Sequence, residues 1–209
     1  MEIVRKFKRN KKRLGDWKNP TDEVKPGRRL KLEEGVERQF DMPPEMAAAV
    51  QSQLNLVELA ADLTGKNPEA ARKIYDDFGS RWMQAVIAAA DGEFKDRTAE
   101  MVEKVAAQTG LRFPHLFSRY LELSLLSLRP GDKWNVTVST PQELLFQEYS
   151  CAIFSKFKEA GLDLRGTPCG AICFARFGQA MRKAQIGCAI SHKKRMDADG
   201  LCEFQFLSR

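Results

Sequence analysis

The chain has 209 residues, of which 43% are apolar and 30% are charged. This composition is ordinary for a soluble globular protein and excludes a wholly disordered chain, a collagen-like fibre and a small disulfide scaffold. Charged residues interrupt every apolar stretch, so no transmembrane helix is expected, and no apolar core follows the basic amino terminus, so no secretory signal is expected either.

The net charge of +6 lies in the amino-terminal segment. Residues 1–38 contain 13 Lys and Arg against 7 Asp and Glu, whereas the rest of the chain contains 21 of each. Pro20, Pro26 and the pair Pro43-Pro44 interrupt any helical pattern, so residues 1–43 are predicted to form an extended basic arm. We expect residues 1–38 to be a solubilising tail or a docking segment for a partner protein or a second copy of the chain. Attachment to a nucleic acid (RNA) or to an anionic lipid surface is the weaker alternative.

Residues 44–131 are predicted to form a helical region. Apolar residues recur at helical spacing, and Gly-, Pro- or Asp-containing steps separate the periodic segments. Asn67-Pro68-Glu69 is a strong start signal, because Asn caps a helix, Pro suits its first position and Glu its first turn. The four predicted helices span residues 44–63, 68–90, 95–108 and 114–128.

Residues 132–209 change to a mixed pattern, and we expect them to pack with residues 44–131 as one globular domain. Alternating and β-rich segments predict strands at 134–138, 143–149, 185–192 and 201–207, and helical segments lie at 152–160 and from 167 or 168 to 183. The predicted fold class is therefore α+β, with the order β-β-α-α-β-β and a small antiparallel sheet.

The last two predicted strands form a hairpin whose loop, residues 196–200, contains Gly. If the loop centres on Ala198, the register places His192 opposite Phe204, Lys194 opposite Cys202 and Cys188 near Ser208. Since alternate residues share a face, Cys202, Phe204 and Phe206 are predicted to be structural residues on the core side of the sheet, together with His192.

All five cysteines lie in the last part of the chain: Cys151, Cys169, Cys173, Cys188 and Cys202. An odd number of cysteines without an export signal predicts the reducing cytoplasm. Cys169 and Cys173 share one face of a helix and suit a metal ion or redox chemistry. Cys151 begins a predicted helix, where the helix amino terminus is expected to lower its pKa, and His192 is the better placed of two histidines to act with it. Buried, purely structural roles for these side chains are the alternative.

Four segments carry a family resemblance: Tyr149-Ser150-Cys151-Ala152, Ala160-Gly161-Leu162, Pro168-Cys169-Gly170-Ala171-Ile172-Cys173 and Asp199-Gly200-Leu201-Cys202-Glu203-Phe204-Gln205-Phe206. Together they make residues 134–206 resemble the 2-aminothiazoline-4-carboxylate hydrolase family, which has a distant likeness to small-molecule-binding domains of the four-vinyl reductase type. Two positions depart from the family pattern. Ala152 replaces a proline, and Phe174, Ala175 and Arg176 follow Cys173 where the family has an acidic residue.

The resemblance implies hydrolysis of a C–N bond in a small sulfur- and nitrogen-containing heterocycle. In that hypothesis Cys151 is the nucleophile and His192 relays the proton. Alternatively, Cys151, Cys169 and Cys173 hold zinc with a water at the open position. Two further functions stay open: a non-enzymatic, sensor-like domain that binds a small molecule or a metal, and an assembly subunit that docks a partner through its basic arm.

Overall fold

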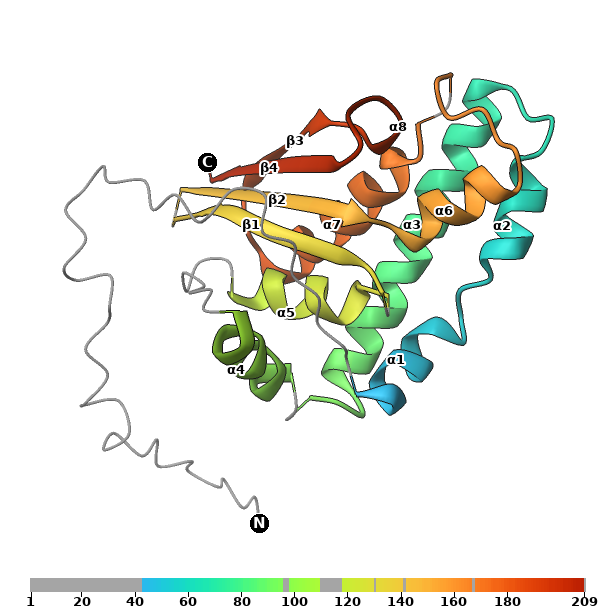
Figure 1. Cartoon of the computed structure of the whole chain (residues 1–209). Coiled ribbons are helices and arrows are strands. Elements are labelled where there is room, and N and C mark those ends of the chain that lie inside the picture. Colours follow the sequence, from blue (N-terminus) through green and yellow to red (C-terminus); the bar gives the residue numbers. More distant parts are fainter. Residues whose placement is uncertain are drawn as a thin grey trace, which may run out of the picture.

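The computed structural model describes residues 43–95, 98–109, 118–129, 131–140, 142–166 and 168–208 (Figure 1). The predictions for the basic arm therefore lie outside the described residues, except at Pro43. The first residues, 114–117, of the helix predicted at 114–128 also lie outside the described residues.

The first half of the described chain is helical, as predicted, but the helix predicted at 44–63 is wrong. It is two helices, because the chain turns at Ser52 and the Asn55 side chain starts a new helix by accepting hydrogen bonds from the N–H groups of Val57 and Glu58, both at 3.1 Å. The described residues of this region form the helices α1 (Pro44–Gln51), α2 (Leu56–Leu63), α3 (Pro68–Asp91), α4 (Thr98–Thr109) and α5 (Ser118–Ser127). Within the described ranges, no helix has both the length and the apolar character needed to cross a bilayer.

The second half forms a four-stranded antiparallel sheet with the order β1-β2-β4-β3, which confirms the predicted α+β class and the β-β-α-α-β-β order. Its elements are β1 (Lys133–Ser139), β2 (Glu143–Ser150), α6 (Ala152–Glu159), α7 (Gly170–Ala184), β3 (Cys188–Lys194), the short helix α8 (Met196–Asp199) and β4 (Cys202–Ser208). Figure 1 shows α3, α5 and α7 on one side of the sheet.

The terminal hairpin follows the predicted register in part. His192 lies opposite Phe204 and Cys188 opposite Ser208, as predicted. Lys194, however, lies opposite Glu203 instead of Cys202, because a bulge after His192 shifts the pairing. The predicted strand also begins too early, since Gln185 has a left-handed backbone (φ 56°) that ends α7.

One hydrophobic core joins the helices to the inner face of the sheet, and Trp82, Phe157, Phe177, Phe204 and Phe206 are among its fully buried side chains. Within it, α3 and α7 approach closely at Gly79. A Cβ atom at this position would lie against the carbonyl oxygen of Ile172 and 2.9 Å from the Cβ of Ala175. The absence of a side chain at Gly79 therefore sets the distance between the two helices.

Candidate functional site

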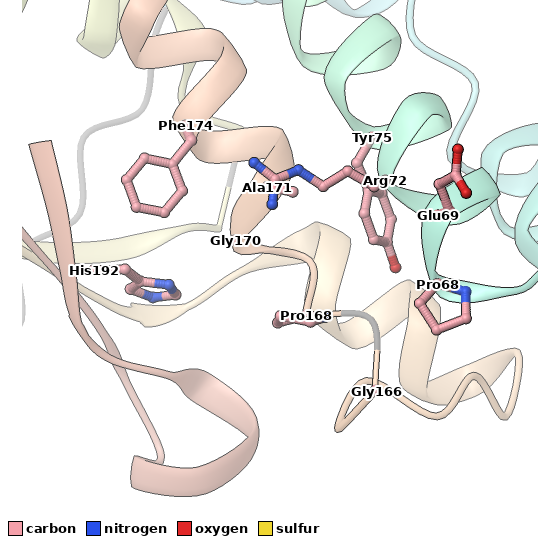
Figure 2. Close-up of a pocket in the computed structure, with 10 residues that line it drawn as sticks. All are labelled: Pro68, Glu69, Arg72, Tyr75, Gly166, Pro168, Gly170, Ala171, Phe174 and His192. Atoms are coloured by element: carbon pink, nitrogen blue, oxygen red, sulfur yellow. The ribbon is translucent and has the colours of Figure 1, made fainter.

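A cavity of about 430 Å³ opens beside the first turns of α7 (Figure 2). The start of α3 forms one wall, the segment before α7 and its first turns form another, and β3 contributes a single side chain. The lining residues are Pro68, Glu69, Arg72, Tyr75, Gly166, Pro168, Gly170, Ala171, Phe174 and His192. This volume falls in the range that small organic ligands occupy in proteins.

The imidazole of His192 is held by aromatic rings on two sides. It stacks on Phe204 at 4.2 Å between centroids, with the planes 7° apart, and the ring of Phe174 meets it edge-on at 6.1 Å. Its Nε2 atom is buried and has no hydrogen-bond partner among the described residues. The position thus resembles a packed core histidine, as one hypothesis held, and at the same time lines the cavity.

The charge state of His192 follows from its surroundings. Burial lowers its pKa most, and the nearby guanidinium of Arg195 lowers it further, while Asp197 and Asp199 act in the opposite direction. The imidazole is therefore neutral at pH 7, and a neutral imidazole offers one N–H donor and one lone-pair acceptor.

Gly170 makes room for that imidazole at the start of α7. A Cβ atom at position 170 would lie 2.6 Å from Nδ1 and 2.7 Å from Cε1 of His192. Gly166 lines the same cavity, but a Cβ atom there would meet nothing within 4 Å. Of the two cavity glycines, therefore, only Gly170 is required by close packing.

The α3 wall supplies the polar groups of the cavity. Figure 2 shows the Arg72 side chain extending from α3 toward α7, beside the Tyr75 ring. Arg72 is largely exposed and lies 3.5 Å from the Asp76 carboxylate, while Tyr75 is buried and stacks on Phe157 with centroids 6.0 Å apart. The cavity thus combines two aromatic rings, a neutral imidazole and two side chains of opposite charge on α3, Arg72 and Glu69.

The predicted thiols lie on the opposite side of the first turns of α7, in a closed cluster around Glu148. Glu148 is 2% exposed and lies opposite Cys202 in the sheet. Its carboxyl group shares a hydrogen bond with the Cys151 thiol. Burial, reinforced by the neighbouring Asp132, raises the pKa of Glu148 to about 7, although Arg176 acts against this. Glu148 is thus half protonated near neutral pH.

The expectation that a helix amino terminus lowers the pKa of Cys151 is wrong. Burial, with Glu148 and Cys173 nearby, raises that pKa well above its ordinary value. The first N–H group of α6, from Ala152, donates to Asp132 Oδ1 at 2.9 Å, so a carboxylate already occupies the helix terminus. Cys151 is therefore a neutral thiol at pH 7.

The structure brings most of the predicted cysteines together. Cys173 raises the pKa of Cys151 and of Cys169, and burial is the main cause that raises the pKa of Cys169 to about 12. Burial also raises the pKa of Cys173 and Cys202. Across the described part of the chain, no group of three or more His, Cys, Asp and Glu side chains is arranged to hold a metal ion, so the zinc site at Cys151, Cys169 and Cys173 gains no support.

The predicted pair of Cys151 and His192 gains no support either. The side chains that shift the pKa of Cys151 are Glu148, Cys173 and Asp132, whereas those that shift the pKa of His192 are Arg195, Asp197 and Asp199. The groups that shift the two pKa values thus differ, and the nucleophilic role stays a prediction.

Sequence reasoning missed the charged groups that anchor the thiol cluster. Asp132 was not predicted to have any role at the site. Its Oδ2 atom accepts the N–H of Arg129 at 2.8 Å and its Oδ1 atom accepts the N–H of Ala152, so it joins the end of α5 to the start of α6. Arg176 is 2% exposed and its guanidinium carbon lies 4.6 Å from the Trp82 ring centroid. The signal for Arg176 was present, since an arginine on the apolar face of a helix requires partners.

No protein-family model matches the chain, and no curated protein matches it. Among solved structures, the chain is similar to the H-NOX domain from Shewanella oneidensis, determined by NMR in the Fe(II)CO ligation state. The TM-score is 0.38 and the sequence identity is 15%, over 79% of this chain and 74% of that chain. A likeness of this size assigns neither a fold family nor a function.

Proposed function

We propose that the protein binds a small ring-containing organic molecule in the cavity between α3, α7 and β3. The cavity of about 430 Å³ beside His192 is the observation that carries this proposal. It has the usual features of a ligand site: a concave shape, aromatic lining and a few polar groups in fixed positions.

The lining suggests how such a ligand is held. The rings of Phe174 and Tyr75 offer apolar surface for a flat molecule, and His192 is fixed by Phe204 in one orientation. Arg72 and Glu69 give the α3 wall charges of both signs, so a ligand with a polar group directed toward α3 suits the cavity. The ligand class is therefore a small, partly polar ring compound.

The two cavity glycines provide a matched test. Anilinonaphthalene sulfonate, a fluorescent anionic ring compound, is titrated into the wild-type chain, Gly170→Ala and Gly166→Ala, and a set of small ring compounds is tested as competitors by ligand-observed NMR. We expect Gly166→Ala to bind as the wild type does, and Gly170→Ala to bind about tenfold more weakly, because the new Cβ displaces His192.

Thermal unfolding of each variant shows whether it is folded. Equal binding by all three folded chains would place the probe outside the cavity and contradict the proposal. Absence of binding by the probe and by every competitor would contradict it as well.

The hydrolase function implied by the family resemblance stays a prediction, and the state of its nucleophile opposes it. A thiol whose pKa is raised is protonated at neutral pH and is a poor nucleophile. The test is turnover of a 2-aminothiazoline carboxylate by the wild type and by Cys151→Ser. Turnover that is lost in Cys151→Ser, while the variant stays folded, would revive the hydrolase hypothesis.

A further inference from the structure

Described residues of α7 and β4 hold the His192 imidazole in one orientation. Phe204 stacks on one face of the ring with centroids 4.2 Å apart, and the ring of Phe174 meets it edge-on. On another side the backbone of Gly170 lies so close that a Cβ atom there would be 2.6 Å from Nδ1 and 2.7 Å from Cε1. The ring nitrogens therefore have fixed positions in the wall of the cavity.

A hydrogen bond within β3 fixes which ring nitrogen carries the proton. The imidazole donates to the backbone carbonyl of Lys194, two residues further along the strand and just past the bulge. Nε2 has no hydrogen-bond partner among the described residues, so the donor to Lys194 is Nδ1. A neutral imidazole carries one proton, which this hydrogen bond places on Nδ1. Nε2 therefore presents a lone pair and accepts hydrogen bonds.

The position of Nε2 makes the source of its partner a question of specificity. The atom is buried, so bulk water does not satisfy it, and a buried acceptor without a hydrogen bond is unfavourable. His192 nevertheless lines the cavity, and Figure 2 shows the nitrogen-bearing end of its ring directed away from the strand and toward the cavity. A group that enters the cavity is thus better placed than water to donate to Nε2.

We propose that His192 selects the ligand of this cavity, and that the ligand is a flat ring compound whose own N–H or O–H group donates to Nε2. This inference rests on the proposed function, because it needs the cavity to be a ligand site. A donor at this point forms a hydrogen bond in a place from which water is excluded, where such a bond is stronger than in water. An acceptor at the same point would face the Nε2 lone pair and is rejected.

Two ring compounds that differ at a single position test the proposal. Indole carries an N–H group where benzofuran carries an oxygen atom. Benzofuran is the more hydrophobic of the two, so burial of apolar surface alone favours benzofuran. Each compound is titrated at pH 7 against anilinonaphthalene sulfonate bound to the full-length chain. We expect indole to bind the wild type about tenfold more tightly than benzofuran.

Two substitutions in β3 show whether His192 causes this selectivity. His192→Phe keeps a ring opposite Phe204 but has no lone pair in the plane of that ring, so the tenfold preference should fall to less than about twofold. Ser191→Ala is the control, because adjacent strand residues point to opposite faces of the sheet. The control should keep the preference for indole. Thermal unfolding shows whether each variant is folded.

A spectrum of the wild-type chain keeps the proposal testable if His192→Phe does not fold. The chain is labelled with ¹⁵N-histidine, and His115→Gln assigns the signals, since the sequence has two histidines. We expect a proton–nitrogen correlation spectrum to show Nε2 of His192 as the unprotonated nitrogen and Nδ1 as the protonated one. Indole should shift the Nε2 signal toward that of a hydrogen-bonded nitrogen, and benzofuran should not.

The outcomes separate this inference from the proposed function. Equal binding of the two compounds by the wild type, or a preference for indole that persists in folded His192→Phe, would overturn the inference alone. A protonated Nε2 in the wild-type spectrum would overturn it as well, and so would binding of anilinonaphthalene sulfonate that neither compound displaces. Absence of binding by the sulfonate and by both compounds would contradict the proposed function, and the inference would fall with it.

Discussion

The two sides of the first turns of α7 are built for different tasks. Gly170, Ala171 and Phe174 face the cavity, whereas Cys173 and Arg176, one helical turn apart, face the closed cluster around Glu148. The cavity side holds a neutral imidazole and space for a ligand. The cluster side holds the strongly shifted pKa values and no cavity lining.

This contrast separates two signals that are often taken together. Perturbed pKa values tend to mark functional sites, but buried networks that hold a fold together perturb pKa values as well. Here Asp132, Glu148 and Arg176 join α6, α7 and the sheet, and none of them lines the cavity. We therefore assign stability to the cluster and ligand binding to the cavity, and the two assignments are separable by mutation.

The largest effect is expected from Arg176→Met. The substitution removes the buried cation that favours the charged forms of Asp132 and Glu148, together with its contact with Trp82. Loss of one member of a buried charge network costs about 3 to 5 kcal/mol. Urea unfolding monitored by circular dichroism measures the change in the free energy of unfolding.

The control for Arg176→Met is Arg182→Met, at an exposed position on the same helix, with an expected change below about 0.5 kcal/mol. Equal effects of the two substitutions would mean that the cluster does not stabilise the fold.

The next effect is the pH dependence of stability due to Glu148. Its pKa is about 7 in the folded chain against 4.5 ordinarily, so the folded state binds the proton more tightly. Glu148 therefore contributes to the free energy of unfolding in full below pH 4.5. This contribution falls by about 3 kcal/mol in total as the pH rises from 4.5 through 7. Glu148→Gln, which cannot ionise, should lose this decline, whereas Glu103→Gln, at an exposed position on α4, should keep it.

The measurement is the urea unfolding free energy at steps from pH 5 to pH 8. An unchanged decline in folded Glu148→Gln would assign the pH dependence to another group.

The thiols of the cluster should react slowly. In a Cys188→Ser background, which removes a half-buried thiol, the four remaining thiols are Cys151, Cys169, Cys173 and Cys202. Because their pKa values are raised, we expect reaction with a disulfide reagent at pH 8 to be about a hundredfold slower in the folded chain than in urea. A thiol that reacts as fast in the folded chain as in urea would contradict this expectation. If the fast reaction is absent in Cys151→Ser, the thiol is Cys151.

The smallest change in stability is expected on the cavity side. Phe174→Leu loses the edge contacts with His192 and Phe204, which costs about 1 kcal/mol. Binding of anilinonaphthalene sulfonate should weaken in this variant. Phe154→Leu, at a half-buried position on α6 outside the cavity, should leave binding unchanged. If both variants bind the probe as the wild type does, Phe174 has no part in ligand contact.

Much of the fold could be predicted because periodicity is a local signal. The strands of the sheet and helix α3 lie close to their predicted ranges, and the pairing of His192 with Phe204 follows from the loop alone. The errors come from single residues. The helical spacing of apolar residues continues across the Asn55 cap, so the break between α1 and α2 was missed, and one bulge moved Lys194 opposite Glu203.

The site was less accessible to prediction, because it depends on contacts between distant segments. The sequence singled out His192 and the cysteines but could not place Arg72 and Tyr75, which lie on α3, beside the start of α7. It also could not show whether burial or the helix amino terminus controls the pKa of Cys151, since burial is a property of the packed chain. Gly170 carried no signal of its own, because its role is to leave space for an imidazole on another element.

The contact between α3 and α7 at Gly79 limits how this sequence can vary. Every residue other than glycine brings a Cβ atom against Ile172 and Ala175, on the helix that separates the cavity from the cluster. Any substitution at this position would thus disturb both sides of α7 at once. Chains that descend from the same ancestor and keep both sites should therefore keep glycine at this position, even where the exposed face of α3 has diverged beyond recognition.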